Sequence, residues 1–303
     1  MDIKSLLRGG RVVIVIVGPT GVGKTKLSIE LAKKYNGEVI NADSTQVYRG
    51  MDIATAKVTE SEKEGIVHHL LDIKNIDEDY TVFDFQRDCR NCISDILSRD
   101  KVPIVVGGTG LYIKAALYDY KFDSFDCSFD YSNYSDDELY DRLISIDPNC
   151  SVHKNNRKRV ERALSYYDST GKLFSEKEKT DVVLYNCCFI GLTTSRDVLY
   201  DRINRRVDLM FDNGLLDEAR NIFDSGVRSK AVMTPIGYKE LFPYFLGESS
   251  LDYCKDIIKQ KSRNYAKRQY TWFNNQMNID WFNVDFNCFS NTVDSVCNFI
   301  DCK

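Results

Sequence analysis

The chain of 303 residues is poor in several features that mark special classes of protein. Five prolines and no biased tract exclude collagen-like and low-complexity chains. There is no run of the ~18 apolar residues that a membrane-spanning helix needs, so we expect no membrane association. The run Val12–Val17 follows Lys4, Arg8 and Arg11, but it is short, and Gly18–Pro19 rather than a small-residue cleavage site comes next. We therefore expect no secretion signal.

The chain also lacks an excess of basic charge. It has 41 Lys and Arg residues against 45 Asp and Glu, a formal net charge of −4. Nucleic-acid-binding domains usually carry an excess of basic residues, so the global charge by itself argues against such a function. Apolar residues make up 43% and aromatic residues 12%, which excludes a disordered chain and allows a substantial core. The location of the charges, rather than their sum, has to decide the question.

The cysteines and histidines indicate neither disulfides nor a metal site. Ten cysteines without the spacing of a disulfide framework favour a reducing compartment and a cytoplasmic location. Cys89 and Cys92 form one C-x-x-C pair, with no second pair and no histidine nearby. Because they fall in a helical pattern, we expect partly buried apolar side chains rather than a zinc site. We also expect the adjacent His68 and His69 to be structural, since neighbours on a chain seldom converge on one metal ion.

Apolar runs and amphipathic segments alternate along the chain. Patterns of buried strands occur at Val12–Val17, Glu38–Ala42, Val102–Val106 and Cys187–Leu192. Apolar residues recur at helical spacing in Lys24–Tyr35, from Phe85 to Leu97, in Asp197–Phe211 and in Leu251–Gln276. Strands that alternate with helices predict parallel βαβ units, so we expect an α/β fold whose parallel sheet is flanked by helices on both faces.

Residues 119–185 depart from this alternation. Between Asp119 and Asp147 there are nine acidic residues and two basic ones, and the chain then continues to about Asp181 in a helical pattern without a clear strand. We interpret 119–185 as a small helical domain that is inserted into a core made of residues 1–118 and 186–303.

A glycine-rich turn joins the first predicted strand to the first predicted helix. It matches the pattern G-x-x-x-x-G-K-[ST] in its required context and consists of Gly18, Pro19, Thr20, Gly21, Val22, Gly23, Lys24 and Thr25. Small residues in this motif let backbone N–H groups converge on phosphate oxygens, and the helix N-terminus adds the positive end of its dipole. Lys24 supplies a point charge, and the Thr25 hydroxyl suits Mg²⁺. We therefore expect a P-loop NTPase-like sheet that binds a diphosphate or a polyphosphate.

The expected metal-binding acid is missing from the neighbouring strand. NTPases of this class hold Mg²⁺ with a carboxylate that closes a second strand, whereas Val102–Val106 is followed by the sequence GGTG at 107–110. The only carboxylate that closes a strand near the glycine-rich turn is Asp43. Either Asp43 takes the metal role, or the protein does not hydrolyse a nucleotide.

These motifs belong to a longer match. The chain resembles the tRNA dimethylallyltransferase (tRNA isopentenyltransferase) family in collinear order over essentially its whole length. The matching segments are GPTGVGKT at 18–25, INADSTQVYRGMDIATAK at 40–57, HHLLDI at 68–73, YTVFDFQRD at 80–88, PIVVGGTGLYIKA at 103–115, NNRKRVERAL at 155–164, LYDRINRRVDLMFDNGLLDEA at 199–219, IGYKEL at 236–241 and SRNYAKRQYTWF at 262–273. The chain departs from the family at Thr45, where members often carry arginine, and at Lys154, where a proline is often found.

The resemblance implies a prenyl transfer. A dimethylallyl group would pass from dimethylallyl diphosphate to the exocyclic amine of the adenosine 3′ of the anticodon, in tRNAs that read codons starting with U, and diphosphate would be released. The P-loop would then hold diphosphate rather than ATP, and Lys24 and Mg²⁺ would stabilise the charge on the leaving group. Arg205 or Arg206 is a candidate for a further diphosphate contact.

The resemblance also implies roles for residues at two strand ends. By motif position, Asp43 would be the general base that accepts a proton from the amine, and Thr109 would position the adenine. The segment that begins with Asp43 would touch the nucleotide through Ser44, Thr45 and Gln46.

Two short basic clusters are candidates for RNA contact. The first contains Lys154, Arg157, Lys158, Arg159 and Arg162, and the second contains Lys259, Lys261, Arg263, Lys267 and Arg268. Without the resemblance, each would be interpreted as a solvated helix face. With it, we expect contacts to the tRNA backbone, made in the insertion by Lys158, Arg159 and Arg162. Such contacts position RNA and are sensitive to salt, but they do not read its sequence.

Three other functions remain open on the sequence. An adenylate isopentenyltransferase would use free AMP, ADP or ATP as acceptor and need not grip an anticodon stem, so the basic insertion favours tRNA. A small-molecule kinase would need ATP, and a non-catalytic P-loop RNA-binding module is disfavoured by Asp43 and Thr109 in their motif settings. We expect a monomer that uses Mg²⁺ as cofactor and binds tRNA and dimethylallyl diphosphate.

Overall fold

The computed structural model describes residues 12–122, 125, 129–176 and 182–302. Lys4, Arg8 and Arg11, which precede the first apolar run, lie outside the described residues, as do Asp123 and Asp126 of the acidic stretch. The chain divides into two compact units, Met1–Asp119 with Val182–Lys303 and Tyr120–Asp181, which are described separately. Among the described helices, none is both long enough and apolar enough to cross a membrane.

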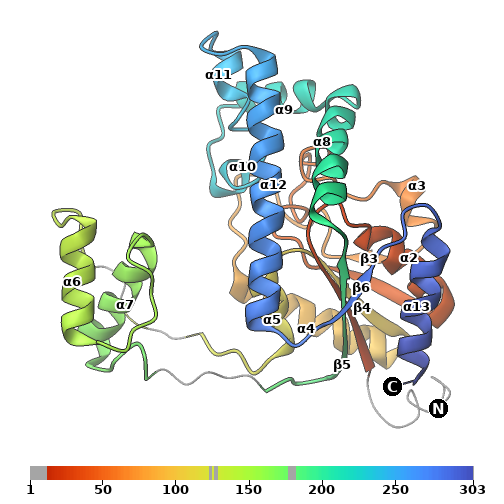
Figure 1. Cartoon of the computed structure of the whole chain (residues 1–303), viewed down its shortest axis with the longest axis horizontal. Helices are drawn as coiled ribbons and strands as arrows, with labels where there is room; N and C mark the ends of the chain where they lie inside the picture. The colour runs from red at the N-terminus through yellow and green to blue at the C-terminus, as the bar shows by residue number, and fades with distance from the viewer. Residues whose placement is uncertain (1–11, 123–124, 126–128, 177–181, 303) are drawn as a thin grey trace. The chain divides into compact units, whose positions relative to one another are not determined.

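A six-stranded parallel sheet forms the centre of the larger unit (Figure 1). Its strands are β1 (Val12–Val17), β2 (Gly37–Asn41), β3 (His68–His69), β4 (Val102–Val106), β5 (Asn186–Thr193) and β6 (Asp280–Asn283). Their order across the sheet is β3-β2-β4-β1-β5-β6, and Val15 in β1 lies opposite Val105 in β4 and Phe189 in β5. Because β2, β4 and β1 are parallel neighbours, their C-terminal ends meet at one edge.

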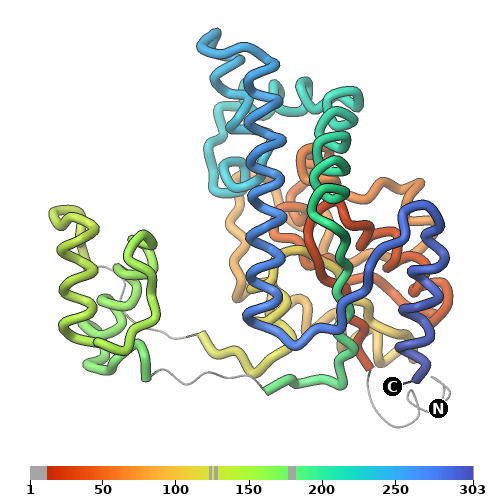
Figure 2. Tube along the Cα trace, in the orientation of Figure 1, coloured from red at the N-terminus to blue at the C-terminus, as the bar shows by residue number. Residues whose placement is uncertain are grey.

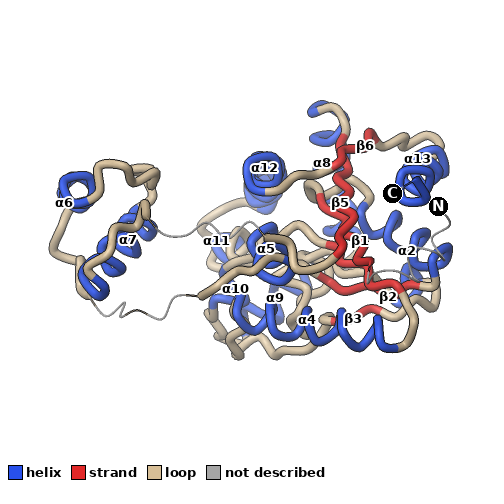
Figure 3. Tube along the Cα trace, turned by 90° about the horizontal axis from the view of Figure 1, so that it is seen from below, coloured by secondary structure: helices blue, strands red, loops and turns tan. Residues whose placement is uncertain are grey.

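Helices cover both faces of this sheet. The helices of the larger unit are α2 (Lys24–Tyr35), α3 (Glu60–Lys63), α4 (Val82–Ser98), α5 (Gly110–Leu117), α8 (Arg196–Asp212), α9 (Leu215–Asp224), α10 (Lys230–Met233), α11 (Phe242–Phe245), α12 (Leu251–Gln276) and α13 (Phe289–Cys302). Helices α2 and α13 pack on one face, and α4 and α5 pack on the other (Figure 3). Although they are far apart in the sequence, α2 and α13 lie side by side (Figure 2). The long helix α12 packs against α8.

The central strands have the composition of a sheet that is buried on both faces. Side chains alternate between the two faces of a strand, so that Val15 packs in the same cluster as Phe85 of α4, whereas Ile14 and Ile16 pack with Leu27 of α2. None of these five side chains is exposed to solvent. Burial of each one stabilises the folded chain by about 1.5–3 kcal/mol. A continuous β-branched run, without polar alternation, is what such a strand needs.

The α/β architecture and the central strands agree with the sequence-based expectation. Strand β2 begins one residue earlier than the predicted Glu38–Ala42, and α12 has its predicted bounds. The sequence pattern does not indicate the two edge strands β3 and β6. Both are short and only partly buried, so they lack the long apolar run that marks a central strand.

The cysteines and histidines named above occupy structural positions. Cys89 is buried and Cys92 half-buried in α4, both as free thiols, and burial raises the pKa of the Cys92 thiol to about 11. His69 in β3 contacts the buried carboxylate of Glu38 with 2.7 Å between Nε2 and Oε2, and Arg99 at the end of α4 pairs with the same carboxylate. Among the described residues, no group of three His, Cys, Asp or Glu side chains is placed to hold a metal ion.

The smaller unit consists of two helices and the segments around them. Helices α6 (Asp136–Ile146) and α7 (Arg157–Thr170) share a core that is separate from that of the sheet. The buried members of this core are Tyr131, Leu139, Leu143, Cys150, Val152, Val160, Ala163 and Leu164. Arg142 of α6 donates hydrogen bonds to both carboxylate oxygens of Asp168 in α7, at 2.8 and 2.9 Å. A core and an ion pair thus join the two helices.

The chain leaves and rejoins the larger unit through a short antiparallel pairing. The N–H of Asp119 donates to the carbonyl oxygen of Val182, and the N–H of Leu184 donates to that of Leu117, both at 2.9 Å. This pairing places residues 182–184 in the larger unit, shortly before β5 in the chain.

Candidate active site

The C-terminal ends of β1, β2 and β4 carry most of the predicted site residues. The phosphate loop (residues 18–25) follows β1, segment 43–46 follows β2, and residues 107–110 follow β4. These three strands are neighbours in the sheet. Open α/β sheets bind ligands at this edge, where the loops after the strands diverge.

The phosphate loop depends on glycine at two positions. Gly18 has a φ of 141°, and a Cβ atom there would lie 2.6 Å from the carbonyl oxygen of Leu192 in β5. Gly23, with a φ of 99°, directly precedes the first residue of α2. Glycine adopts these backbone angles without strain. The loop therefore brings the N-terminus of α2, with its N–H groups and positive dipole end, to the edge of the sheet.

Lys24 is the charged residue of the phosphate loop. Its Nζ donates a 2.9 Å hydrogen bond to the carbonyl oxygen of Pro19, a residue that has no N–H to offer a phosphate. Burial and the positive charge of Arg206 lower the pKa of Lys24 to about 8, while the negative charge of Asp43 opposes the shift. Lys24 therefore lies within electrostatic reach of both groups. A bound diphosphate would supply the negative charge that favours its protonated form.

Arg206, rather than Arg205, faces the phosphate loop. Nη1 of Arg206 donates to Oγ1 of Thr20 at 2.9 Å, whereas the side chain of Arg205 is 77% exposed and pairs with an acid of its own helix. One turn earlier on α8, Arg202 donates from Nε to the carbonyl oxygen of Gly21 at 3.1 Å. Helix α8 thus contributes two positive side chains, four residues apart, that contact the phosphate loop.

Asp43 is held at the end of β2 by its neighbours. The buried side chain of Asn41 accepts a hydrogen bond from the Asp43 N–H at 3.2 Å and donates to the carbonyl oxygen of Leu70 at 3.0 Å. Thr45 donates twice to Oδ1 of Asp43, from its N–H at 2.9 Å and from its hydroxyl at 2.7 Å. Oδ2 accepts no hydrogen bond from the residues that the structure describes. This second oxygen is the one that a substrate amine could reach.

Thr109 lies directly beside segment 43–46. Its Oγ1 accepts a 3.1 Å hydrogen bond from the N–H of Ser44. The glycine that follows β4 makes the approach possible, because a Cβ atom on Gly107 would lie 2.1 Å from the carbonyl oxygen of Ala42. The GGTG sequence therefore packs its backbone against the end of β2 and brings Thr109 and Asp43, from different strand ends, into one site.

One face of α12 completes the site, and no residue of that face is among the predicted site residues. The buried Gln269 accepts a hydrogen bond from the N–H of Thr20 at 2.9 Å and donates to the carbonyl oxygen of Gly108 at 3.0 Å. One side chain thus joins the phosphate loop to the loop that carries Thr109. Tyr265 lies one turn earlier on α12, and burial together with the negative charge of Asp43 raises the pKa of its hydroxyl.

The spacing of the residues on α12 could have indicated this face. Tyr265 and Trp272 are expected to be core residues, and Trp272 does pack tightly, since a Cβ atom on Gly110 would lie 2.0 Å from its ring. Gln269 stands between them at helical spacing, on the same face of the helix. A buried amide needs hydrogen-bond partners, so an amide in an apolar stripe indicates a contact with polar backbone.

Gln46 is fixed through its amide nitrogen. Nε2 donates to the carbonyl oxygens of Thr55 at 3.0 Å and Ala56 at 3.3 Å. The other end of the amide, Oε1, is then the part of the side chain that could meet a nucleotide, and it can only accept a hydrogen bond.

The first basic cluster lies in the smaller unit and is divided by ion pairing. Arg157 donates to Glu161 at 2.7 Å and also pairs with an acid of α6. Lys158, Arg159 and Arg162 are exposed on α7, and none of them pairs with an acid among the described residues. The three residues expected to bind tRNA are therefore exposed and, unlike Arg157, are not paired with an acid among the described residues.

Most of the second basic cluster is engaged within the protein. Its partners are on α8 and in the segment before α11, in the pairs Lys259–Asp208 at 2.6 Å, Lys261–Glu240 at 3.1 Å and Arg263–Asn204 at 2.6 Å. Lys267 and Arg268 are exposed. The structure thus gives three of the five residues a role in packing α12, which leaves Lys267 and Arg268 as candidates for RNA contact.

Sequence comparisons relate the chain to prenyltransferases of tRNA. The family model described as IPP transferase matches residues 46–276. The tRNA dimethylallyltransferase of Anoxybacillus flavithermus is 48% identical over 97% of this chain and 97% of its own. That of Geobacillus thermodenitrificans is 50% identical over 90% of each chain.

Solved structures give the same relationship. The full-length tRNA isopentenylpyrophosphate transferase of Bacillus halodurans is 45% identical and aligns with a TM-score of 0.75 over 96% of this chain and 95% of its own. A eukaryotic dimethylallyltransferase, described as acting on tRNA, is 33% identical and aligns with a TM-score of 0.83 over 96% of this chain and 80% of its own. With its sheet, its phosphate loop and these relatives, the chain belongs to the IPP transferase family.

Proposed function

We propose that this protein transfers a dimethylallyl group from dimethylallyl diphosphate to the exocyclic amine of an adenosine in tRNA and releases diphosphate. The acceptor is the adenosine 3′ of the anticodon, in tRNAs that read codons starting with U. The observation that carries the proposal is that the phosphate loop, Asp43 and Thr109 follow three strands that are neighbours in the sheet, with Thr109 hydrogen-bonded to the N–H of Ser44. Membership of the IPP transferase family and the names of its relatives support the same reaction.

The diphosphate is bound by the phosphate loop in this proposal. When the carbon–oxygen bond of the allylic diphosphate breaks, negative charge grows on the departing oxygen. The N–H groups at the start of α2, Lys24 and Arg206 are held where they can meet that charge. Because these groups are already in place, little reorganisation is needed as the charge develops.

Asp43 accepts the proton that the adenine amine loses as the new carbon–nitrogen bond forms. An exocyclic amine of adenine is a poor nucleophile, so its orientation contributes as much as removal of its proton. Oδ1 of Asp43 is occupied by Thr45, and Oδ2 would receive the amine. Thr109 would fix the adenine beside this oxygen. The adenine must leave the base stack of the anticodon loop to reach the site, at a cost of a few kcal/mol.

Mg²⁺ fits the site as an ion shared with the substrate. The described residues contain no group of three His, Cys, Asp or Glu side chains that would hold it alone, but Mg²⁺ commonly binds to one or two protein oxygens together with substrate phosphates and water. The hydroxyl of Thr25, exposed in the first turn of α2, would hold the ion against the diphosphate. The bound ion would offset the negative charge of the leaving group.

We assign tRNA recognition to segment 43–46, Thr109 and the inserted helical domain of residues 119–185. The exposure of Lys158, Arg159 and Arg162 on α7 supports a contact with the RNA backbone. The monomeric state and the cytoplasmic location stay predictions.

Labelled dimethylallyl diphosphate tests the reaction. Parallel incubations contain a tRNA that reads codons starting with U, the same tRNA with guanosine in place of the target adenosine, and free AMP, and a separate one tests phosphoryl transfer from labelled ATP. We expect label in the first tRNA alone. Label in AMP but not in tRNA would instead identify an adenylate isopentenyltransferase, and phosphoryl transfer from ATP would identify a kinase.

A variant of Asp43 tests the role of the carboxylate. Asp43→Ala should abolish prenyl transfer while leaving the melting temperature and tRNA binding close to those of the unmodified protein. Full transfer activity in this variant would refute the assignment of Asp43 as general base.

A further inference from the structure

The carboxylate of Glu218 in α9 accepts four hydrogen bonds, three of them from a loop that is distant in the sequence. The loop comprises residues 51–57 and is called the 51–57 loop. Oε2 of Glu218 accepts hydrogen bonds from the N–H groups of Asp52 at 2.9 Å and Ile53 at 2.8 Å, and Oε1 accepts from the N–H of Ala54 at 3.0 Å and from the hydroxyl of Tyr238 at 2.8 Å. A carboxylate can accept all four bonds, because each of its oxygens has two lone pairs. Three successive backbone groups are thereby fixed on one side chain.

A second segment that is distant in the sequence, residues 237–240, contacts both Glu218 and the 51–57 loop. Tyr238, its fourth partner, has no exposed surface. The adjacent Gly237 has a φ of 132°, and a Cβ atom there would lie 2.9 Å from Cβ of Ala54. The N–H of Gly237 donates to Glu240 at 2.8 Å, and Glu240 pairs with Lys261 of α12 at 3.1 Å. Residues 237–240 therefore hold the 51–57 loop against α9 and connect it to α12.

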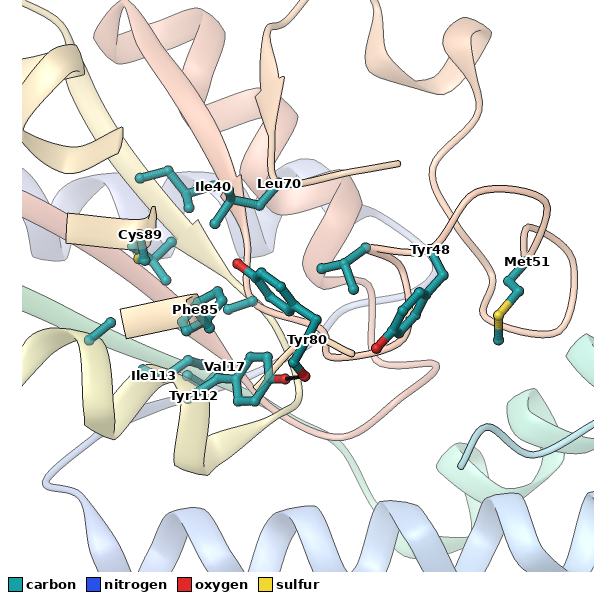
Figure 4. Packing of buried hydrophobic residues seen from close by; sticks show 14 of the residues in the cluster. Val17, Ile40, Tyr48, Met51, Leu70, Tyr80, Phe85, Cys89, Tyr112 and Ile113 are labelled. Carbon is teal, nitrogen blue, oxygen red and sulfur yellow. Dashed lines mark hydrogen bonds between the residues drawn. The ribbon is translucent and has the colours of Figure 1, made fainter. Parts of the chain in front are cut away.

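The core of the larger unit holds the beginning of the same loop. Tyr48 and Met51 belong to the buried cluster that also contains Tyr80 and Tyr112 (Figure 4). The hydroxyl of Thr55 donates to the carbonyl oxygen of Met51 at 2.6 Å, which closes the loop on itself. The loop is thus fixed by the core at one end and by Glu218 in its middle.

The far end of the 51–57 loop reaches the proposed RNA site. The carbonyl oxygens of Thr55 and Ala56 accept the two hydrogen bonds of the Gln46 amide nitrogen. Gln46 is half-buried, three residues after Asp43. As long as the two carbonyl groups stay in place, Gln46 presents Oε1, an acceptor, to its surroundings. If they move, the amide can rotate and present its nitrogen, a donor, instead.

We propose that Glu218 is a positioning residue for RNA recognition. It anchors the 51–57 loop so that Gln46 presents the oxygen of its amide, rather than the nitrogen, to an RNA base. The inference rests on the proposed function, because it requires a nucleotide at segment 43–46. Glu218 itself touches no substrate and acts only through the loop and Gln46.

The variant Glu218→Gln tests this role. The amide keeps the shape of the carboxylate. Its NH₂ group, however, must face N–H or O–H donors that gave hydrogen bonds to the carboxylate of Glu218. We expect the KM for an anticodon stem-loop to rise about tenfold, with the KM for dimethylallyl diphosphate unchanged. Asp217→Asn is the matched control, since it removes one negative charge from the neighbouring, exposed position of α9. It should leave both KM values unchanged.

A double-mutant cycle with Gln46→Ala separates positioning from general stabilisation. If Glu218 acts through Gln46, adding Glu218→Gln to Gln46→Ala should raise the KM for RNA by less than about twofold. A full tenfold rise in that background would show that Glu218 acts elsewhere and would overturn the inference. So would an unchanged KM for RNA in Glu218→Gln itself.

Tyr238→Phe keeps the test valid if Glu218→Gln does not fold. This variant removes one of the four hydrogen bonds and retains the buried ring, and we expect a rise of about threefold in the KM for RNA. The rise should again vanish in the Gln46→Ala background, and its persistence would refute the positioning role. A wild-type protein that transfers no label to RNA would instead refute the proposed function, which distinguishes the two failures.

Discussion

The hydroxyl of Thr45 donates a 2.7 Å hydrogen bond to Oδ1 of Asp43, and the backbone N–H of the same residue donates to this oxygen at 2.9 Å. Members of the family often carry arginine at this position. In this chain, a residue expected to touch the nucleotide therefore orients the proposed general base. With Oδ1 engaged twice by Thr45, Oδ2 is the carboxylate oxygen left for the substrate amine.

Replacement of the Thr45 hydroxyl should slow the chemical step. Thr45→Val keeps the branched shape and the backbone N–H but removes the hydroxyl donor, so Asp43 loses one of its two orienting hydrogen bonds. We expect kcat for prenyl transfer to fall about tenfold, or ~1.4 kcal/mol, with the KM for dimethylallyl diphosphate unchanged. Thr45→Ser, which retains the hydroxyl, should stay within about twofold of the unmodified enzyme. Equal kcat values for the Val and Ser variants would contradict this account.

The lowered pKa of Lys24 should limit activity at alkaline pH. The ammonium form attracts the diphosphate, and it predominates below the pKa of about 8. As pH rises through this value, the positive charge is lost. The kcat/KM for dimethylallyl diphosphate should therefore decrease, by a factor that approaches ten per pH unit well above the pKa. This parameter reports the free enzyme. Lys24→Arg should be less active but should lack this alkaline fall, because arginine stays charged. A flat profile of the unmodified enzyme between pH 7 and 10 would exclude Lys24 as the titrating group.

Adjacent arginines of α8 should differ sharply in their effect on diphosphate binding. Arg206 contacts Thr20 of the phosphate loop, whereas Arg205 is exposed and pairs within its own helix. Arg206→Ala should raise the KM for dimethylallyl diphosphate and lower kcat, with a combined loss of about 100-fold in kcat/KM. Arg205→Ala serves as the control and should change it by less than about twofold. Comparable losses in both variants would contradict the distinction drawn here between Arg206 and Arg205.

Local patterns were sufficient to predict the four central strands of the sheet and the phosphate loop. The β-branched run Val12–Val17 has few alternatives to a buried parallel strand, and the phosphate loop is encoded within eight consecutive residues. Asp43 stands out because it is a carboxylate that follows a predicted strand, whereas its role as a base and the role of Thr109 are implied by the family resemblance. For such sites the chemistry is local, and the parallel sheet brings the strand ends together.

Residues that act through long-range contacts could not be predicted in this way. Gln269 and Thr20 are 249 positions apart, and Glu218 is 164 or more positions from the three N–H groups that it binds. Their partners are mostly backbone N–H and carbonyl groups, which every residue has, so no side-chain motif marks the contact. Charge clusters mislead for the same reason. Lys261 belongs to a basic stretch, yet its partner is a carboxylate with no exposed surface, on a segment that the stretch does not reveal.

The basic side chains of α7 should set the salt dependence of RNA binding. Lys158 and Arg162 lie one turn apart and are exposed, so each would release about one counterion from an RNA phosphate. Lys158→Ala and Arg162→Ala should each weaken binding of the anticodon stem-loop at low salt and reduce the slope of log K against log salt concentration by about one. They should weaken cognate and mismatched stem-loops equally, because phosphate contacts do not read bases. Lys259→Gln is the control, since Lys259 is paired with Asp208 at 2.6 Å and should leave the slope unchanged. If the α7 variants left the slope unaltered while Lys259→Gln reduced it, the RNA would be held by α12 rather than by the inserted helices.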